Sequence, residues 1–335
     1  MNIIVIKPYA SVIYNGGVQA QARMWKTELE ELGHNVIFFD NWTNTDWAKV
    51  DIVLFMCYGK LLVDYLNLLK AYENIRFYIA PIIDYNGRMW QFKLRSRYYG
   101  SVTLRWRKEL HDFYVSRKQI DGFLVRSEHE KRFLTEGFAM GDEKIHIVPL
   151  SYRIKEPSVD KSKKENFCLH VSRLSSPGKN VNRLIEAAKK YGFNLKLAGE
   201  LKGEKEREWM KNAIKEYSNI EYVGRPTDKE LAELYHRARV FALPSTVEGV
   251  GMVAMEAALY GCEVVLTNWG APKEYYDGQA ILVNPLDVDD IGKGIIKALN
   301  GFAQPCLKKF IEENYNEKRC SKLLEKALLN KVQHN

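Results

Sequence analysis

Short apolar runs alternate with helical patterns along the whole chain. An apolar run of about four to eight residues between turn signals is typical of a buried strand, whereas apolar positions spaced three and four residues apart predict an amphipathic helix. The strands predicted for the first half are residues 2–8, 35–40, 51–57, 76–84, 121–127 and 144–150. Helices are predicted at 18–33, 61–73 and 128–137. Strands separated by helices predict a parallel sheet with helices on its faces.

The same alternation restarts after a polar, lysine-rich stretch at residues 153–165, which we interpret as a linker. The strands predicted after it are residues 167–174, 194–200, 220–225, 240–245, 263–268 and 280–285, with helices at 181–192, 229–238 and 252–261. We therefore predict an α/β protein with two doubly wound Rossmann-like domains, residues 1–152 and 166–305. Residues 306–335 are predicted to form helices that pack back toward the first domain. Ligands of such sheets bind at the carboxyl ends of the strands, so the expected site is a central cleft that the two domains face.

Composition narrows the class of protein. The chain has 335 residues, of which 46% are hydrophobic and 27% charged, as in a globular protein. Its apolar runs are shorter than a spanning helix needs, and the N-terminus lacks a charged stretch before its first apolar run, so we expect neither a transmembrane helix nor a signal peptide. Five scattered cysteines without a C-x-x-C spacing favour a reducing, cytoplasmic setting. No His/Cys cluster has zinc-ligand spacing, and we expect no metal.

Glu256 is the most informative single residue. It is the only charged residue in the run "MVAMEAALY", residues 252–260. A carboxylate in a helix that is apolar all round needs partners, since an unpaired buried charge is costly. The hydroxyls of a ligand could supply them, because a carboxylate accepts two hydrogen bonds from neighbouring hydroxyls. The alternative is a buried ion pair with an Arg or Lys.

Three junctions between a strand and a helix carry glycine or basic residues where a phosphate could bind. Gly16 and Gly17 precede the first predicted helix, where paired glycines allow close approach to a ligand or form a simple tight turn. Arg173 and Lys179 flank the loop before the helix at 181–192, an arrangement that suits a diphosphate. Glu248 lies in the glycine-containing loop before the helix that holds Glu256.

The spacing of Glu248 and Glu256, preceded by "LPS" and followed by "AALYGCEVV", resembles the donor site of retaining glycosyltransferases of the GT-B fold, family 4. Residues 223–245 and 172–188 are similar to blocks of that family in the same order, and residues 16–39 resemble its N-terminal glycine loop. The resemblance extends from Met1 to about Gly301.

The resemblance implies a role for each matching residue. Arg173 and Lys179 would bind the donor diphosphate, Glu256 the ribose hydroxyls, and Glu248 a hydroxyl of the transferred sugar. The amides of Val250, Gly251 and Met252 would face the sugar and phosphate, the Gly16–Gly17 loop would close over the donor, and Arg225 would approach the base. The family commonly has a His-Asp pair after its fourth strand, whereas this chain has Ile83 and Asp84. Asp84 and Glu248 are the catalytic candidates.

The sequence "DVDD" at residues 287–290 contains a D-x-D pattern, which is a metal-diphosphate signature in another glycosyltransferase fold. It follows a predicted strand and precedes a helical pattern, so we interpret Asp287 as a helix cap. We accordingly expect no metal and no cofactor, with a nucleotide sugar as co-substrate.

Residues 85–118 hold nine Lys and Arg residues against two acidic ones, interleaved with aromatic residues. Such a segment suits an anionic membrane surface, a phosphorylated acceptor or single-stranded nucleic acid, and a solvated helical face is the plain alternative. We select Arg95, Arg97, Arg105 and Arg107 as candidates for a surface that binds an acceptor or a membrane.

The favoured function is retaining transfer of a hexose from a nucleoside-diphosphate sugar to a glycan, a lipid-linked or another anionic acceptor, in the cytoplasm or at the inner face of the membrane. Two alternatives remain. A sugar-nucleotide epimerase of the GT-B fold would release free nucleotide without an acceptor. A nucleic-acid-binding protein would use the basic segment and leave Glu248 and Glu256 without a role, so we expect no nucleic acid as partner.

Overall fold

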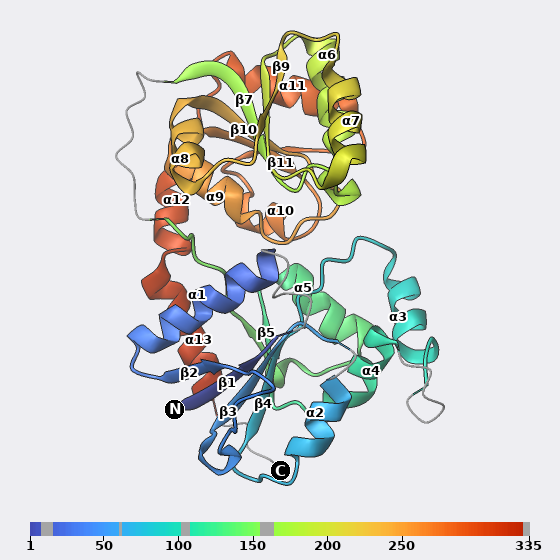
Figure 1. Ribbon diagram of the computed structural model, residues 1–335, viewed down its shortest axis with the longest axis vertical. Helices are drawn as coiled ribbons and strands as arrows, with labels where there is room; N and C mark the ends of the chain where they lie inside the picture. Colours follow the sequence, from blue (N-terminus) through green and yellow to red (C-terminus); the bar gives the residue numbers. More distant parts are fainter. Residues whose placement is uncertain (8–15, 60–61, 102–107, 155–163, 331–335) are drawn as a thin grey trace. The chain divides into compact units, whose positions relative to one another are not determined.

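The computed structural model describes residues 1–7, 16–59, 62–101, 108–154 and 164–330 (Figure 1). The chain forms two compact units. The first comprises Met1–Leu150 with Glu317–Asn335, and the second comprises Ser151–Asn316. Each contains a six-stranded parallel sheet with helices on its faces, which confirms the predicted α/β class with two doubly wound sheets.

The first unit alternates strands with helices. Its strands are β1 (Asn2–Ile6), β2 (Asn35–Phe38), β3 (Ile52–Met56), β4 (Arg76–Ala80), β5 (Gly122–Val125) and β6 (Ile145–Ile147). Its α-helices are α1 (Gly17–Glu31), α2 (Leu62–Leu69), α3 (Met89–Tyr98), α4 (Glu109–Ser116), α5 (Glu128–Arg132) and α13 (Glu317–Leu329). Short 3₁₀ or π turns are η2 (Trp47–Lys49), η3 (Arg117–Gln119), η4 (Phe133–Gly137) and η5 (Asp142–Lys144). The strand order is β2-β1-β3-β4-β5-β6. The connection that leaves β1 and the connection that leaves β3 therefore run in opposite directions along the sheet.

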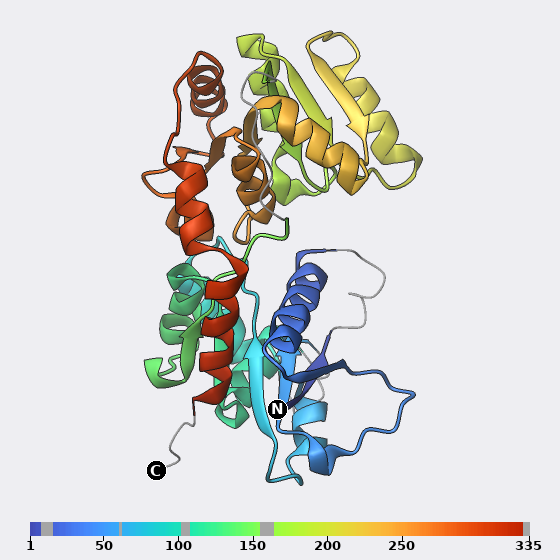
Figure 2. The ribbon, with the colours of Figure 1, turned by 90° about the vertical axis from the view of Figure 1, so that its left-hand side faces the viewer.

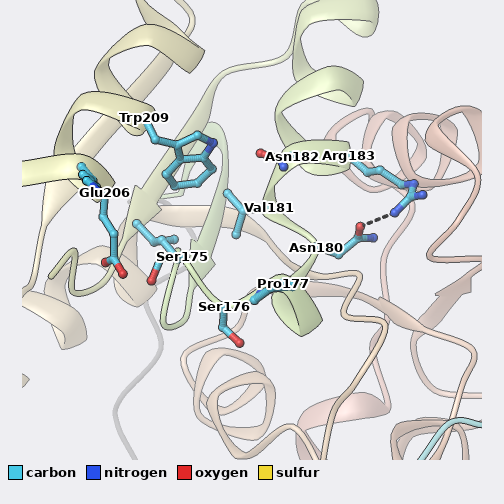
Figure 3. Close-up of a pocket in the computed structure, with 11 residues that line it drawn as sticks. Ser175, Ser176, Pro177, Asn180, Val181, Asn182, Arg183, Glu206 and Trp209 are labelled. Atoms are coloured by element: carbon cyan, nitrogen blue, oxygen red, sulfur yellow. Dashed lines mark hydrogen bonds between the residues drawn. The ribbon is translucent and has the colours of Figure 1, made fainter.

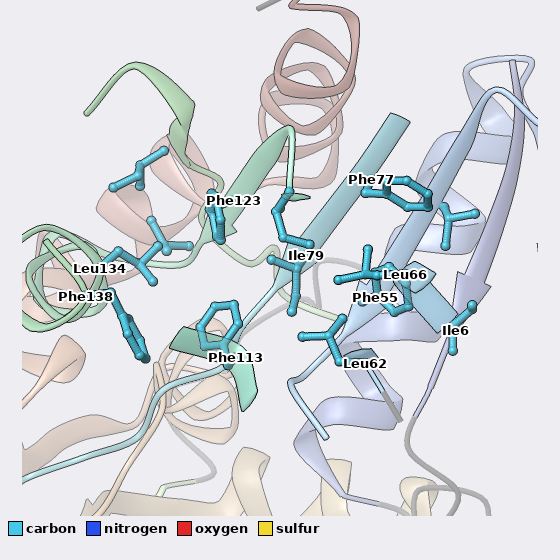
Figure 4. Packing of buried hydrophobic residues seen from close by; sticks show 14 of the residues in the cluster. Ile6, Phe55, Leu62, Leu66, Phe77, Ile79, Phe113, Phe123, Leu134 and Phe138 are labelled. Carbon is cyan, nitrogen blue, oxygen red and sulfur yellow. The ribbon is translucent and has the colours of Figure 1, made fainter. Parts of the chain in front are cut away.

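Apolar side chains from both sheet and helices form the core of the first unit. One buried cluster joins strand residues such as Phe55, Ile79 and Phe123 to Leu66 of α2 and Phe113 of α4 (Figure 4). Strands that are buried on both faces need apolar residues at successive positions, which is why they are continuous apolar runs in the sequence.

Strand β4 ends earlier than the sequence predicts. The apolar pattern predicts a strand over residues 76–84, but β4 ends at Ala80. Pro81 follows, and Ile82 has a left-handed backbone with φ of 55°. Proline removes a donor from the sheet ladder, and a β-branched residue with positive φ cannot continue a strand.

The second unit repeats the design with a different order. Its strands are β7 (Glu165–Val171), β8 (Leu195–Ala198), β9 (Ile220–Gly224), β10 (Ala238–Leu243), β11 (Glu263–Thr267) and β12 (Ile281–Val283). Its helices are η7 (Pro177–Lys179), α6 (Val181–Tyr191), α7 (Gly203–Ile214), α8 (Asp228–Arg237), α9 (Met252–Leu259), α10 (Ala271–Tyr276), α11 (Val288–Leu299) and α12 (Leu307–Asn314). The strand order is β12-β11-β10-β7-β8-β9.

The two C-terminal helices belong to different units, although the sequence treats residues 306–335 as one segment. Helix α12 packs on α9 through the buried residues Leu307 and Ile311, and it belongs to the second unit. Helix α13 packs on α1 and β5 of the first unit (Figure 2). Its buried face includes Leu324 and Leu328. In the same unit, His34 Nε2, in the turn between α1 and β2, lies 2.9 Å from Glu325 Oε1 of α13.

Candidate functional site

The carboxyl ends of β7 and β10 mark the switch point of the second sheet. These neighbouring parallel strands are followed by connections that run in opposite directions along the sheet. A crevice forms outside the strand ends at such a point, and this is where doubly wound sheets bind ligands. The chain leaves β7 toward Arg173 and Lys179, and it leaves β10 toward Glu248.

Backbone hydrogen bonds join the two loops that follow these strands. The amides of Thr246 and Val247 donate to the Gly178 carbonyl, at 2.8 and 3.1 Å. Asn180 has a left-handed backbone with φ of 58°, and its buried side chain donates to the carbonyls of Pro244 at 2.9 Å and Pro285 at 2.6 Å. Sequence reasoning missed Asn180, which fixes the loop that presents Lys179.

Lys179 and Glu248, predicted for diphosphate and sugar, are in direct contact. Lys179 Nζ lies 2.8 Å from Glu248 Oε2, and the Ser245 hydroxyl donates to the same oxygen at 2.9 Å. The Glu248 side chain is 10% exposed and that of Lys179 is 26% exposed. The ammonium of Lys179 and the carboxylate of Glu248 are therefore adjacent. The ammonium can bind a phosphate oxygen while the carboxylate accepts a hydrogen bond from a neighbouring hydroxyl.

Glu256 is the fifth residue of α9, and its side chain is 2% exposed. Arg153 donates from Nε to Glu256 Oε1 at 2.7 Å, and the Tyr235 hydroxyl lies 3.4 Å from Oε2. Burial raises the pKa of Glu256, and the charge of Arg153 opposes this rise. The alternative of a buried ion pair is thus present in the structure. Sequence reasoning named neither Arg153 nor Tyr235.

The N-terminus of α9 lies between the two glutamates. Gly251 has φ of 72°, a conformation that favours glycine, and the Tyr276 hydroxyl fixes it by donating to its carbonyl at 2.8 Å. Val250 is buried and Met252 begins the helix. Amides in the first turn of a helix have no acceptor within the helix, so this end is suited to an anion.

Arg173 and Arg225, the other cations predicted to bind the donor, are exposed. Arg225 Nη1 lies 3.6 Å from Glu200 Oε1, and both side chains are largely solvated, so this contact holds Arg225 weakly. Arg173 follows β7. The pKa of Glu206 is lowered mainly by the hydrogen bonds that it accepts from Lys202 and Ser175, and the charge of Arg173 makes a smaller contribution.

A hollow of about 430 Å³ adjoins the loop that carries Lys179. It is lined by residues of that loop, the start of α6 and the face of α7 (Figure 3). Trp209 and Glu206 come from α7, while Val181 and Asn182 come from α6 (Figure 3). Lys179 and Glu248 are not among the residues that line this hollow, although Pro177 and Asn180 of the same loop are.

In the first unit, Asp84 is bound by a buried arginine. Arg126 Nη2 donates to Asp84 Oδ1 at 2.6 Å, while its Nε donates to Glu130 Oε2 at 3.0 Å. Ile83, which stands where the resembled family has a histidine, is buried, and its amide donates to Glu130 Oε1 at 2.6 Å. His129 is the nearby imidazole. Its pKa is lowered, mainly by burial.

Two strained residues lie at the same edge of the first sheet. Cys57 after β3 and Ile82 after β4 both have positive φ, 68° and 55°. Such conformations persist only where the surrounding structure imposes them, and they cluster at functional sites. They support a functional role for the edge that holds Asp84.

Gly16 and Gly17 begin α1. Neither has a positive φ, and a Cβ placed on either would meet none of the described residues within 4 Å. The backbone angles therefore do not require glycine at these positions.

Helix α3 carries part of the predicted basic surface. Arg95 is exposed, and the Arg97 guanidinium lies 5.9 Å from the centre of the Tyr114 ring. Arg105 and Arg107 lie outside the described residues. Trp90, Leu94 and Tyr98 are 58%, 56% and 74% exposed. Residues four apart share a helix face, so these three form an apolar stripe beside the cations.

The D-x-D pattern is a helix cap, as predicted. Asp287 is the N-cap of α11, and its carboxylate accepts hydrogen bonds from the amides of Asp289 at 2.8 Å and Asp290 at 3.2 Å. Within the described ranges, no group of three or more His, Cys, Asp or Glu residues could hold a metal ion. No helix among the same residues is long and apolar enough to cross a membrane.

Residues 152–318 match the family described as Glycosyl transferases group 1. The matched segment includes Arg173, Lys179, Glu248 and Glu256.

Curated relatives match part of the chain. A MMP alpha-(1->4)-mannosyltransferase of Mycolicibacterium hassiacum is 28% identical over 61% of this chain and 50% of its own length. An O-antigen chain mannosyltransferase B of Escherichia coli is 27% identical over 40% of this chain and 37% of its own length. The chain thus spans half or less of the length of these relatives.

Solved structures match nearly the whole chain. A sucrose-phosphate synthase from Thermosynechococcus elongatus superposes with a TM-score of 0.77 at 16% identity, covering 97% of this chain and 98% of its own. The Anabaena protein Alr3699/HepE, in complex with UDP and glucose, gives a TM-score of 0.73 at 13% identity, covering 98% of this chain and 99% of its own. At these identities the likeness shows the fold, which is of the GT-B type.

Proposed function

The chain belongs, through residues 152–318, to the glycosyl transferases group 1 family, and we propose that it transfers a hexose from a nucleoside-diphosphate sugar with retention of configuration. One observation carries this proposal. Lys179 and Glu248 are in contact at the switch point of the second sheet, with Lys179 Nζ 2.8 Å from Glu248, and the loop that holds Glu248 leads into the N-terminus of α9. A cation and free amides can bind a diphosphate where a carboxylate accepts a sugar hydroxyl.

The chemistry follows from the charges. Departure of the diphosphate places negative charge on its oxygens, and Lys179, Arg173 and the first turn of α9 would stabilise that charge. The phosphate oxygen of the donor can accept the proton of the attacking hydroxyl, so the protein needs chiefly to position the two substrates. Glu248 would orient the sugar, Glu256 the ribose, and Arg225 would lie near the base.

The acceptor side belongs to the first unit in this proposal. Asp84, to which Arg126 donates at 2.6 Å, is the acid that we assign to the acceptor side, and the Gly16–Gly17 loop is the segment that we assign to the approach to the donor. We propose a glycan or lipid-linked acceptor, because the relatives that are named mannosyltransferases include one for an O-antigen chain. For the same reason mannose is the first sugar to test.

A thermal-shift screen tests the proposed function. UDP-, GDP- and ADP-sugars, GDP-mannose among them, are added to the purified protein, and the midpoint of unfolding is measured. A donor at about 100 times its dissociation constant adds about 2.7 kcal/mol to the free energy of unfolding, so one nucleotide series is expected to raise the midpoint clearly. If no nucleotide sugar shifts it, the proposal is wrong. Release of an epimerised sugar without any acceptor would identify an epimerase instead.

Turnover is expected to continue in EDTA. Lys179, Arg173 and the helix terminus supply the positive charge that a divalent ion would otherwise bring to the diphosphate. The measurement is sugar transfer after dialysis against the chelator, with and without added Mn²⁺. Activity that disappears and returns with Mn²⁺ would contradict metal-independent transfer.

Trp90, Leu94, Arg95 and Tyr98 together are called the α3 surface. We propose that this surface binds an anionic membrane or a lipid-linked acceptor. Its apolar stripe suits the interface, and each basic residue near an anionic lipid surface contributes about 1 kcal/mol. The triple variant Trp90→Ala, Leu94→Ala, Tyr98→Ala and the charge reversal Arg95→Glu are each expected to reduce sedimentation with phosphatidylglycerol vesicles.

Trp42→Ala is the matched control for this surface, because Trp42 is 95% exposed in the same unit but lies away from α3 in sequence. It is expected to leave vesicle binding unchanged. If the unmodified protein does not sediment with the vesicles, the α3 surface is a solvated face.

A further inference from the structure

The carboxylate of Glu256 is bound by Arg153, a residue that has no role in the proposed function described so far. Arg153 donates from Nε to Glu256 Oε1 at 2.7 Å, and its Nη2 lies 2.5 Å from the same oxygen. Two donors of one planar guanidinium fix the carboxylate more firmly than a single ammonium could. Because Arg153 is 103 residues from Glu256 in the chain, this pairing is set entirely by the fold.

The other carboxylate oxygen retains capacity for a ligand. Oε2 accepts a long hydrogen bond of 3.4 Å from the Tyr235 hydroxyl. A carboxylate oxygen has two lone pairs, so Oε2 can still accept a bond from a ligand hydroxyl. The Arg153 side chain is 41% exposed while that of Glu256 is 2% exposed, so the arginine reaches a buried acid from the solvent side.

We propose that Arg153 is a positioning residue of the donor site, which keeps the buried Glu256 carboxylate ionised and leaves Oε2 to accept a ribose hydroxyl of a nucleoside diphosphate. This inference rests on the proposed function, which supplies the ribose.

The charges around Glu256 explain why one arginine decides its ionisation. Among the residues that the structure describes, the groups that interact with it include Arg153, Tyr235 and Asp228 of α8, Tyr260 after α9, and Tyr276 of α10. Burial raises the pKa of Glu256, and Asp228 raises it further. Arg153, the one cation among these groups, lowers the pKa most, and the hydrogen bond from Tyr235 lowers it as well. Removing Arg153 therefore moves the pKa of Glu256 upward, and the acid loses its charge as the pH falls through that higher value.

Isothermal titration with UDP, GDP and ADP, between about pH 6 and about pH 9, tests the proposal. In the unmodified protein, Glu256 is expected to leave nucleotide affinity nearly independent of pH in this range. Arg153→Met, which keeps much of the side-chain volume, is expected to weaken binding roughly 10- to 100-fold at the acid end and to recover toward the alkaline end. Arg153→Lys should lie between the two.

Arg237→Met is the matched control, because Arg237 pairs with the exposed Glu165 of the same unit and its removal leaves both Arg153 and Tyr235 on Glu256. It is expected to retain the flat pH profile. A pH-independent affinity of Arg153→Met equal to that of the unmodified protein would overturn the proposal. So would tighter binding by this variant, since Arg153 would then compete with the ribose for the carboxylate.

Carbon-13 NMR of glutamate side-chain carboxyls separates this proposal from the proposed function. The Glu256 signal is identified by its absence in Glu256→Gln, and its titration midpoint is measured in the unmodified protein and in Arg153→Met. If no nucleotide binds but the midpoint rises in Arg153→Met, the proposed function fails while the ionisation by Arg153 stands. An unchanged midpoint overturns the role of Arg153.

Discussion

Replacing Lys179 with alanine is expected to lower kcat/KM for the sugar donor by about 100- to 1,000-fold. Two losses combine in this variant. The diphosphate loses a cation that lies at the switch point, and Glu248, whose side chain is only 10% exposed, loses the ammonium 2.8 Å from its carboxylate. Initial rates at varied donor concentration, with the nucleotide sugar identified in the thermal-shift screen, provide the measurement.

Lys205→Ala is the matched control for Lys179→Ala. Lys205 is an exposed lysine on α7 that lines the hollow of about 430 Å³, and its removal is expected to leave kcat/KM unchanged. Lys179→Arg keeps the positive charge and should recover part of the rate. If Lys179→Ala retains turnover within about twofold of the unmodified protein, the pair with Glu248 is structural only.

Replacing Arg126 with methionine is expected to lower the free energy of unfolding by about 3–5 kcal/mol. Arg126 is 6% exposed and donates to both Asp84 and Glu130. Glu130 is 1% exposed, so the variant leaves a buried carboxylate without its charged partner. Two backbone amides, of Ile83 and Arg126, still donate to it, and they offset only part of the loss. Urea unfolding followed by fluorescence measures the change.

Arg132→Ala, at the end of α5, is the control substitution for Arg126→Met. Its partner Glu136 is four residues away and both side chains are exposed, so this substitution is expected to change stability little. Equal effects of the two substitutions would mean that burial of Arg126 does not decide its contribution. A large loss of stability in Arg126→Met with unchanged transfer by the folded fraction would place Asp84 outside the chemistry.

The sequence alone determined the class of fold and several local features. Apolar runs separated by amphipathic patterns are local in the chain, and they identified two doubly wound α/β sheets. The Asp287 cap was predictable because a side chain bonds amides two and three residues away. Glu256 was recognisable as an acid in need of a partner because its neighbours in the helix are uncharged.

Only the tertiary structure decided which groups meet. A buried carboxylate requires a cation or a ligand, but the chain has 50 Lys and Arg residues, and nothing in the periodicity singles out Arg153. Residue 153 also stood at the start of the predicted linker, where no site was expected. Lys179 and Glu248 are 69 residues apart, and their contact depends on the strand order and on Asn180, which joins the loops. Local sequence encodes the period of each element, whereas contacts between distant side chains follow from how the elements pack.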